Sequence, residues 1–297
     1  MMKSPPVACS ATPLKATFAV LAALLFSSSV HAGTLQVEVL DVGQGDAILL
    51  TLPAGERVLI DAGPTKDGVY RQLRGRGIRS LDLVVASHAH LDHIGGMEAV
   101  VESFKIGAYV DSGVPAESAT FQDLERMLSS RKVERTRATT HQSWSWDEVT
   151  ATVLWPGRTY LSDTRSDLNS NSVVLRVDHG DVCFLFTGDA EEPTEEVIAD
   201  DLRGGCEVLK VAHHGSRHST SSHFLDVMQP EIALISCGKD NKFDHPGTDT
   251  LERLERIGAE VFRTDQSGRL ILESDGTDVV MTRGVSRRET LFGGRGG

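Results

Sequence analysis

The chain has 297 residues, with 30 Lys and Arg against 42 Asp and Glu, so its formal net charge is −12. This length suffices for one large domain with a substantial core, and the acidic balance argues against a broad basic face for long polyanions. None of its four cysteines stands in a C-x-x-C pair, which argues against a structural zinc knot.

The first 32 residues have the features of a secretory signal. Lys3 and Lys15 provide a positive start, residues 16–26 form an apolar core, and Val30-His31-Ala32 is a small-x-small cleavage site. We therefore expect cleavage before Gly33 and an exported mature chain that is periplasmic or extracellular.

The alternative to cleavage is a membrane anchor that is retained. The apolar run is short for a membrane span, which favours cleavage, and no later stretch is long and apolar enough to cross a bilayer. The mature chain would keep Cys183, Cys206 and Cys237. An oxidising compartment would permit one disulfide among them and leave one thiol.

Three β-strands are predicted at the start of the mature chain. Residues 35–41 alternate apolar and polar, 48–52 form an apolar run, and 57–63 end in Asp-Ala-Gly. The Gly-Gln-Gly-Asp segment between the first two strands suits a tight connection whose backbone approaches another group closely, although such a segment alone is usually a plain hairpin. Asp61, at a strand end, can accept a hydrogen bond from a metal-ligating histidine, and we expect a similar supporting role for Asp46.

A cluster of three histidines and one aspartate follows a fourth predicted strand, 81–86. Its pattern is H-x-H-x-D-H, and its members are His88, His90, Asp92 and His93. A loop between this strand and a helix over 97–104 can turn all four side chains toward one point. Imidazole and carboxylate are ligands that first-row cations prefer, and such a desolvated group would be costly without an ion. The alternative, a solvated polar loop, does not account for so specific a spacing.

This loop resembles the metal site of the metallo-β-lactamase superfamily of hydrolases. The segments D-V-G-Q-G-D-A at 41–47 and I-D-A-G at 60–63 narrow the resemblance to the ComEC type, the metallo-β-lactamase domain of a DNA-uptake channel. The resemblance implies an α/β fold, a four-layer αββα sandwich, as a single domain over 33–285. The Arg/Gly-rich residues 286–297 are expected to form a disordered tail. The resemblance also implies one or two metal ions, Zn²⁺ or Mn²⁺, with Asp92 both a ligand and the proton acceptor for the attacking water.

The second half of the chain contains a predicted hairpin that leads to another aspartate. Its strands are 171–177 and 182–186, and His179 is expected to lie exposed at the turn. The second strand runs into Asp189. In the superfamily an aspartate at this position bridges the metal ions, so we expect Asp189 to be a ligand.

Two adjacent histidines follow the next predicted strand, 207–212. By resemblance to the superfamily, His214 is the preferred metal ligand and His213 is the alternative. Polar residues further along suit an anionic group: Ser216 and Arg217 offer a hydroxyl and a guanidinium, although helix capping accounts for part of this pattern.

Two further residues match the ComEC-type pattern in order along the chain, Asn241 and His245. We expect Asn241 to contact the substrate together with Ser216. His245 is expected to lie near the metals, where it would bind phosphate or donate a proton as a catalytic residue.

One departure from the superfamily concerns the first metal position. Many members have a further histidine before the bridging aspartate, whereas this chain has D-L-N-S-N-S over 167–172. Asn171 is expected there as a substrate contact or a weaker ligand than imidazole. The metal ion at the position of His88 and His90 is therefore expected to be loosely held, or to be a harder ion such as Mn²⁺.

Three functions are compatible with these features. The first is an exported metal-dependent phosphodiesterase or nuclease that uses a metal-activated water, with DNA among its candidate substrates. The second is a hydrolase of another ester, amide or lactone, such as a choline ester or a β-lactam. The third is a non-enzymatic metal-binding protein. The ligand set argues against the third, and the phosphate-suited residues after His214 favour the first, although the acidic surface argues against long DNA. The sequence indicates no oligomeric state.

Overall fold

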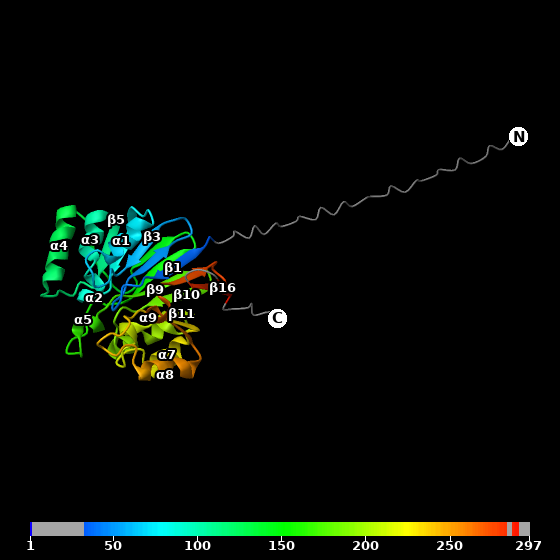
Figure 1. Ribbon diagram of the computed structural model, residues 1–297. Coiled ribbons are helices and arrows are strands. Elements are labelled where there is room, and N and C mark those ends of the chain that lie inside the picture. The colour runs from blue at the N-terminus through cyan, green and yellow to red at the C-terminus, as the bar shows by residue number, and fades with distance from the viewer. Residues whose placement is uncertain (2–32, 284–286, 291–297) are drawn as a thin grey trace. The chain divides into compact units, whose positions relative to one another are not determined.

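The computed structural model describes Met1, residues 33–283 and residues 287–290 (Figure 1). Apart from Met1, the predicted signal segment lies outside these described residues, as do 284–286 and 291–297. Within the described part of the chain, no helix is both long and apolar enough to traverse a bilayer.

The first of two β-sheets has nine strands in the order β16-β15-β14-β1-β2-β3-β4-β5-β6. Their bounds are β1 Leu35–Val39, β2 Ile48–Thr51, β3 Arg57–Ile60, β4 Ser80–Ala86, β5 Lys105–Asp111, β6 Arg135–Arg137, β14 Leu270–Ser274, β15 Val279–Arg283 and β16 Arg287–Thr290. Strands β3 to β6 pair in parallel, so their carboxyl ends share one edge.

The second sheet has seven strands in the order β13-β12-β11-β10-β9-β8-β7. Their bounds are β7 Ser143–Trp146, β8 Val149–Trp155, β9 Val174–His179, β10 Val182–Phe186, β11 Val208–Lys210, β12 Ile232–Ile235 and β13 Glu260–Arg263. Strands β10 to β13 are parallel and also present their carboxyl ends at one edge.

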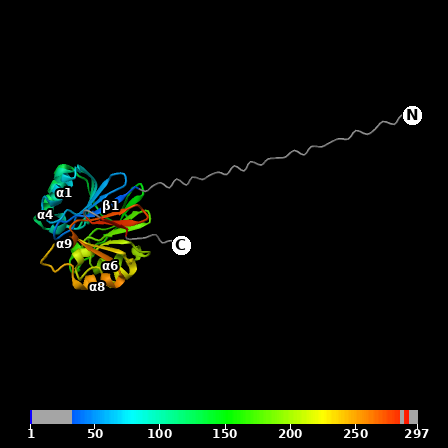
Figure 2. The same ribbon diagram turned by 45° about the vertical axis from the view of Figure 1, so that its right-hand side comes forward.

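Helices cover the outer face of each sheet (Figures 1 and 2). The first sheet carries α1 Gly68–Gly75, α3 Met97–Ser103 and α4 Ala119–Arg131, and the second carries α6 Glu192–Ile198, α7 Ser222–Met228 and α8 Thr248–Ile257. The short elements are α2 Leu91–Ile94, α5 Asp167–Ser170, α9 Thr264–Ser267 and the 3₁₀ turns η1 Ala199–Leu202 and η2 Ala212–Gly215.

Strand β4 shows why the sheets are sandwiched between helices. Leu83 and Val85 belong to the core between the two sheets, whereas Val84 and Ala86 belong to the core beneath the helices. A strand with both faces buried reads as a continuous apolar run, as β4 does. The predicted four-layer αββα sandwich is confirmed.

One expectation differs from the structure. His179 was expected at an exposed turn, but it is fully buried, and its Nδ1 lies 3.1 Å from Ser274 Oγ of the other sheet. The reason is that the β9–β10 pairing runs through to His179 and Val182, which leaves only Gly180 and Asp181 to turn. Within the tail predicted over 286–297, the described residues Arg287–Thr290 form β16, which pairs with β15, and the other residues of that prediction lie outside the described part of the chain.

The cysteines pair as one disulfide and one thiol. Cys183 in β10 is bonded to Cys206 in the segment before β11, and Cys237 is free and buried. The pairing ties two neighbouring strands of the second sheet beneath its helices.

Candidate metal centre

The candidate site lies where parallel strands of both sheets end. The H-x-H-x-D-H loop follows β4, Asp189 follows β10, and His213 and His214 follow β11. Because the carboxyl ends of these strands meet at one edge, residues far apart in sequence are brought together there.

Asp61 organises the first ligand loop. Its carboxylate accepts hydrogen bonds from the Ser87 N–H and the Ser87 hydroxyl, each at 2.7 Å, and lies 2.7 Å from His93 Nδ1. This partner on Nδ1 leaves His93 Nε2 available toward the site, which is how carboxylates orient metal-ligating histidines. The hydrogen bond predicted for Asp61 is therefore present.

The loop after β1 is held against the same segment. The Asp46 N–H donates to the Asp92 carbonyl at 3.1 Å, and a Cβ on Gly45 would lie 2.2 Å from that carbonyl oxygen. Gly45 also has φ +140°, which L side chains rarely adopt. The predicted close backbone approach of this glycine loop is confirmed.

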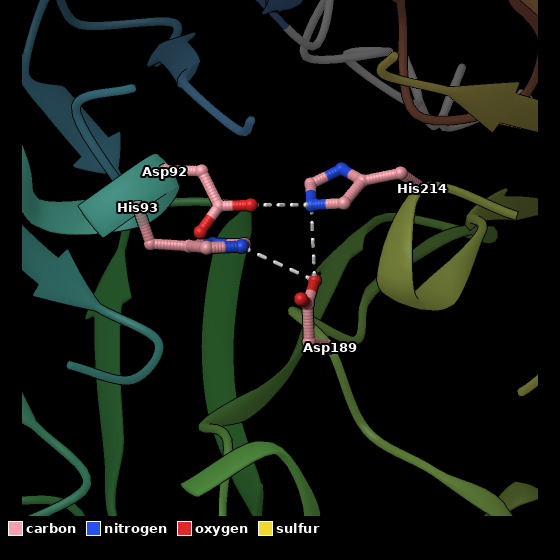
Figure 3. A group of neighbouring side chains, drawn as sticks. All are labelled: Asp92, His93, Asp189 and His214. Carbon is pink, nitrogen blue, oxygen red and sulfur yellow. Dashed lines mark ion pairs between the residues drawn. The ribbon is translucent and has the colours of Figure 1, made fainter. Parts of the chain in front are cut away.

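Four side chains converge on one point: Asp92, His93, Asp189 and His214 (Figure 3). Asp189 Oδ1 lies 3.2 Å from His93 Nε2 and 3.5 Å from His214 Nε2, and His214 Nε2 lies 3.4 Å from Asp92 Oδ2. The first three of these atoms, Asp189 Oδ1 and the two Nε2 atoms, are buried and have no hydrogen-bond partner. Two imidazoles and two carboxylates with unmet polar atoms at one point fit a divalent cation.

Charge in this group is tightly coupled. Burial would lower the pKa of His214, but the carboxylates of Asp189 and Asp46 outweigh it and raise that pKa to about 10. The pKa of His93 is also raised well above its usual value, because Asp189 and Asp61 outweigh burial. A cation bound here would pair with these carboxylates and displace the extra protons of His93 and His214.

A second group shares Asp189. His88 Nε2 lies 2.9 Å from His90 Nδ1 and 3.8 Å from Asp189 Oδ2, and the three residues form a possible metal-binding group. Asp189 thus offers Oδ1 to one group and Oδ2 to the other, which is the geometry of a bridging carboxylate. Burial lowers the pKa of His88 and of His90, which favours the neutral imidazole that binds metals.

His213 faces the same carboxylate oxygen as His88. Its Nε2 lies 3.6 Å from Asp189 Oδ2, and its Nδ1 lies 3.5 Å from Glu191 Oε1 and 3.4 Å from Asn169 Nδ2. His213 and His214 both have positive φ, 48° and 55°. This uncommon backbone conformation turns consecutive side chains to the two sides of Asp189, so both predicted alternatives reach the site.

His214 is supported by a buried ion pair that the sequence analysis did not identify. Its Nδ1 lies 2.9 Å from the Ser236 carbonyl and 3.3 Å from Asp46 Oδ1. The other oxygen of Asp46 accepts a hydrogen bond at 2.5 Å from Lys210 Nζ, which also donates to the Val211 carbonyl at 2.9 Å. Burial acts to raise the pKa of Asp46, but Lys210 and His214 bring it down to about 2.

Comparison with known proteins identifies this arrangement. A family model described as "Metallo-beta-lactamase superfamily" matches residues 40–239. The chain belongs to the metallo-β-lactamase superfamily. With the two His/Asp groups that share Asp189, this membership supports a metal-dependent hydrolase.

Curated relatives of this metallo-β-lactamase domain include competence and recombination proteins. "Recombination protein 2" of Haemophilus influenzae is 33% identical over 258 residues, covering 83% of this chain and 30% of the relative. "Competence protein ComA" of Neisseria gonorrhoeae is 34% identical over 239 residues, covering 79% and 31%. "ComE operon protein 3" of Bacillus subtilis is 29% identical over 267 residues, covering 83% and 34%. The chain therefore spans about a third of the length of these relatives, and the predicted ComEC-type resemblance is confirmed.

Solved structures support the fold. The metallo-β-lactamase fold protein YhfI of Bacillus subtilis has a TM-score of 0.56 at 14% identity, covering 82% of this chain and 100% of that one. Igni18, a metallo hydrolase of Ignicoccus hospitalis, has a TM-score of 0.52 at 14% identity, covering 80% and 98%.

The two asparagines predicted to contact substrate, Asn171 and Asn241, hydrogen-bond the backbone of their own loops in this metallo-β-lactamase domain. The Asn171 amide accepts from the Leu161 N–H and donates to the carbonyls of Leu161 and Asp167, so it holds its own loop. The neighbouring asparagine, Asn169, reaches His213 instead, and its Oδ1 is buried without a hydrogen-bond partner. In a short helical turn the two side chains diverge, which the N-S-N-S pattern does not reveal.

Asn241 likewise supports the backbone of its own loop. Its amide donates to the carbonyls of Gly238 and His245 and accepts from the N–H groups of Phe243 and His245. Both N–H donors and both acceptor positions of the Asn241 amide are thus occupied within the loop. Asn241 thereby fixes the main chain of His245. The substrate contact predicted for Asn241 stays a prediction, and the structure adds its hydrogen bonds to its own loop.

His245 and Ser216 lie in a cleft beside the metal groups. The His245 ring centroid is 5.5 Å from that of His213 and 6.3 Å from that of His214. The cleft is lined by Arg165, His213, Ser216, Arg217, His218, Phe243, Asp244, His245 and Gly247. Burial, assisted by the two neighbouring imidazoles, lowers the pKa of His245 to about 4, so its ring is neutral at neutral pH.

Proposed function

We propose that this chain is a metal-dependent phosphodiesterase or nuclease that binds one or two Zn²⁺ or Mn²⁺ ions. The observation that carries the proposal is a cleft that His213, a neighbour of Asp189, shares with two guanidinium groups. Arg165 and Arg217 line this cleft together with the Ser216 hydroxyl and His245. Guanidinium, hydroxyl and imidazole donors around a metal site suit an anionic phosphoryl group better than a neutral ester or amide.

The metal-binding groups and the cleft would divide the chemistry between them. A divalent ion held by Asp92, His93, Asp189 and His214 would supply a water of lowered pKa and a Lewis acid for a phosphoryl oxygen. Burial acts to raise the pKa of Asp92, but its 3.4 Å contact with His214 and the charge of His93 bring it below its usual range. Asp92 is therefore ionised at neutral pH, which suits an ion ligand that also accepts a hydrogen bond from the attacking water.

His245 would act on the other side of the substrate. Because its ring is neutral, it holds one N–H that can donate a hydrogen bond to a phosphoryl oxygen or to the leaving group. Its main chain is fixed by two hydrogen bonds to Asn241, at 2.6 Å from the Asn241 amide and at 3.1 Å to the Asn241 oxygen. Of the two roles predicted for His245, phosphate binding by a neutral N–H donor fits this ring better than proton transfer from an imidazolium.

The test separates substrate chemistry from metal binding. His245→Ala should lower kcat on a phosphodiester by roughly 10²-fold or more while metal content stays intact, the scale of a lost hydrogen-bond donor to the charge that develops in the transition state. Asp189→Ala should lose metal and activity together, and Ser216→Ala should weaken binding by about 1 kcal/mol, as for one hydrogen bond. Loss of a metal ion from His245→Ala, or activity on a β-lactam but on no phosphodiester, would overturn the assignment.

A nucleic acid is the phosphodiester that the comparisons favour. Relatives named as a recombination protein and a competence protein match most of this chain at about 30% identity. Cleavage of single-stranded and double-stranded DNA by the metal-loaded protein, measured beside a small phosphodiester, tests this substrate class directly.

We also propose that the chain is exported. The positive start, apolar core and Val30-His31-Ala32 site support cleavage before Gly33, and the Cys183–Cys206 disulfide is of the kind that oxidising compartments favour. N-terminal sequencing of the protein from its native cell should begin at or near Gly33. Recovery of intact Met1 from a soluble cytoplasmic fraction would contradict export.

A further inference from the structure

An exposed aromatic ring stands at the mouth of the cleft. Among the described residues, the exposed large apolar side chains are Met1, Leu91, Val197 and Phe243. Phe243 is 51% exposed and lies two residues before His245 in a loop that Asn241 fixes through the Phe243 N–H at 3.1 Å. A single exposed apolar side chain is ordinary on a protein surface, but this one also lines the cleft that contains His245, so its ring borders the space that a substrate would occupy.

The ring is oriented by its neighbours. It stacks on His245, with centroids 5.8 Å apart and planes inclined by 26°, and Lys242 Nζ lies 5.1 Å from its centroid. One face of Phe243 is thus turned to the candidate catalytic imidazole, which in turn faces the metal groups. A planar group next to the reacting phosphoryl group would therefore meet the aromatic ring of Phe243 directly beside His245.

Positive charge in the cleft completes the subsite. Arg165 and Arg217 line it together with Phe243 and one carboxylate, Asp244, so cations outnumber anions there although the chain as a whole carries a net charge of −12. Cations that follow a phosphate backbone, combined with an aromatic side chain on which a base stacks, are what proteins use to bind single-stranded nucleic acid. Paired bases in a duplex would not present a free face to Phe243.

We propose that Phe243 is a specificity-determining residue that stacks on a nucleobase adjacent to the scissile phosphate. The substrate of the cleft is then a single-stranded nucleic acid or a short oligonucleotide, and a phosphodiester without a base binds more weakly. This inference rests on the proposed phosphodiesterase function, but it concerns recognition, so it can be tested separately from catalysis.

Binding provides the first test. Fluorescence anisotropy of a labelled oligothymidylate with the metal-free protein should show about tenfold weaker binding, or more, for Phe243→Ala, the scale of one lost base stack. Phe243→Trp should bind like the wild type, and Val197→Ala, which removes an equally exposed side chain from α6, is the matched control. Equal affinity of Phe243→Ala and wild type would overturn the inference whatever the activity.

A substrate comparison provides the second test. In the wild type, an oligonucleotide with a single abasic site at the cleaved position should have a KM about tenfold above that of the intact one, and Phe243→Ala should bring this ratio close to one. An unchanged ratio with active enzyme would refute the stacking role and leave the phosphodiesterase proposal standing. Competition by glycerophosphocholine as strong as that by oligothymidylate would also overturn it, since it would assign the ring to a quaternary ammonium.

Discussion

Replacement of Lys210 by methionine should destabilise the protein, because Lys210 is the buried partner of a buried carboxylate. The Lys210 and Asp46 side chains are both buried, and their 2.5 Å contact joins β11 of one sheet to the β1–β2 loop of the other. Methionine fills most of the space of the lysine chain, so the cavity term is small. The buried Asp46 carboxylate is then left without its cation. Removal of one partner of a buried ion pair lowers the free energy of unfolding by about 3–5 kcal/mol.

The same change should weaken one metal position. Asp46 Oδ1 lies 3.3 Å from His214 Nδ1. Without Lys210, burial raises the pKa of Asp46 and weakens it as the carboxylate that orients His214, and loss of such a carboxylate typically costs about 10–100-fold in metal affinity. Because His214 keeps its 2.9 Å contact with the Ser236 carbonyl, we expect the lower end, about tenfold, for Lys210→Met. The His88 and His90 group, which has no contact with Lys210, should bind metal with unchanged affinity.

Two measurements check this reasoning. The free energy of unfolding of the metal-free protein is measured in urea, and metal affinity is measured separately by chelator competition. Lys66→Met is the matched control, since the ion pair of Lys66 with Glu98 leaves Lys66 72% exposed and should contribute less than about 1 kcal/mol. The double change Lys210→Met with Asp46→Asn should recover part of the loss, because no unpaired charge remains. A loss below about 1 kcal/mol for Lys210→Met, or full additivity of the two changes, would refute the buried-pair argument.

Three further predictions concern residues that hold the site. Asp61→Asn should weaken metal binding by about 10–100-fold, because His93 loses the carboxylate on its Nδ1, and an unchanged dissociation constant in chelator competition would contradict this. Asn171→Ala should lower the free energy of unfolding by about 1–3 kcal/mol, since it leaves buried loop groups unpaired, and metal content measured by elemental analysis should not change; loss of metal would restore Asn171 as a ligand. Reduction of Cys183–Cys206, which closes a loop with a sequence separation of 23, should lower the free energy of unfolding in urea by about 3 kcal/mol, and equal midpoints with and without reductant would count against it.

The supporting residues are where sequence reasoning was least successful. Lys210 reads as one polar residue in an apolar strand, and only the pairing of β11 with its neighbours buries it beside Asp46. An asparagine can serve a substrate or its own loop equally well, and the choice for Asn171 and Asn241 depends on which backbone groups the folded loop leaves unpaired. His179 was placed wrongly for a similar reason, since one residue of strand extension decides whether it is exposed or buried.

What the sequence by itself determined is local: the H-x-H-x-D-H loop, the strands that precede each ligand segment, and the two-sided apolar pattern of β4. These follow from spacing and periodicity along a few consecutive residues, which is why they were predictable. What only the tertiary structure decided is the sharing of Asp189 by two groups and the turning of His213 and His214 to its two oxygens. Those features arise because parallel strands from two sheets end at one edge, so the distances that define the site join atoms that have no fixed separation along the chain.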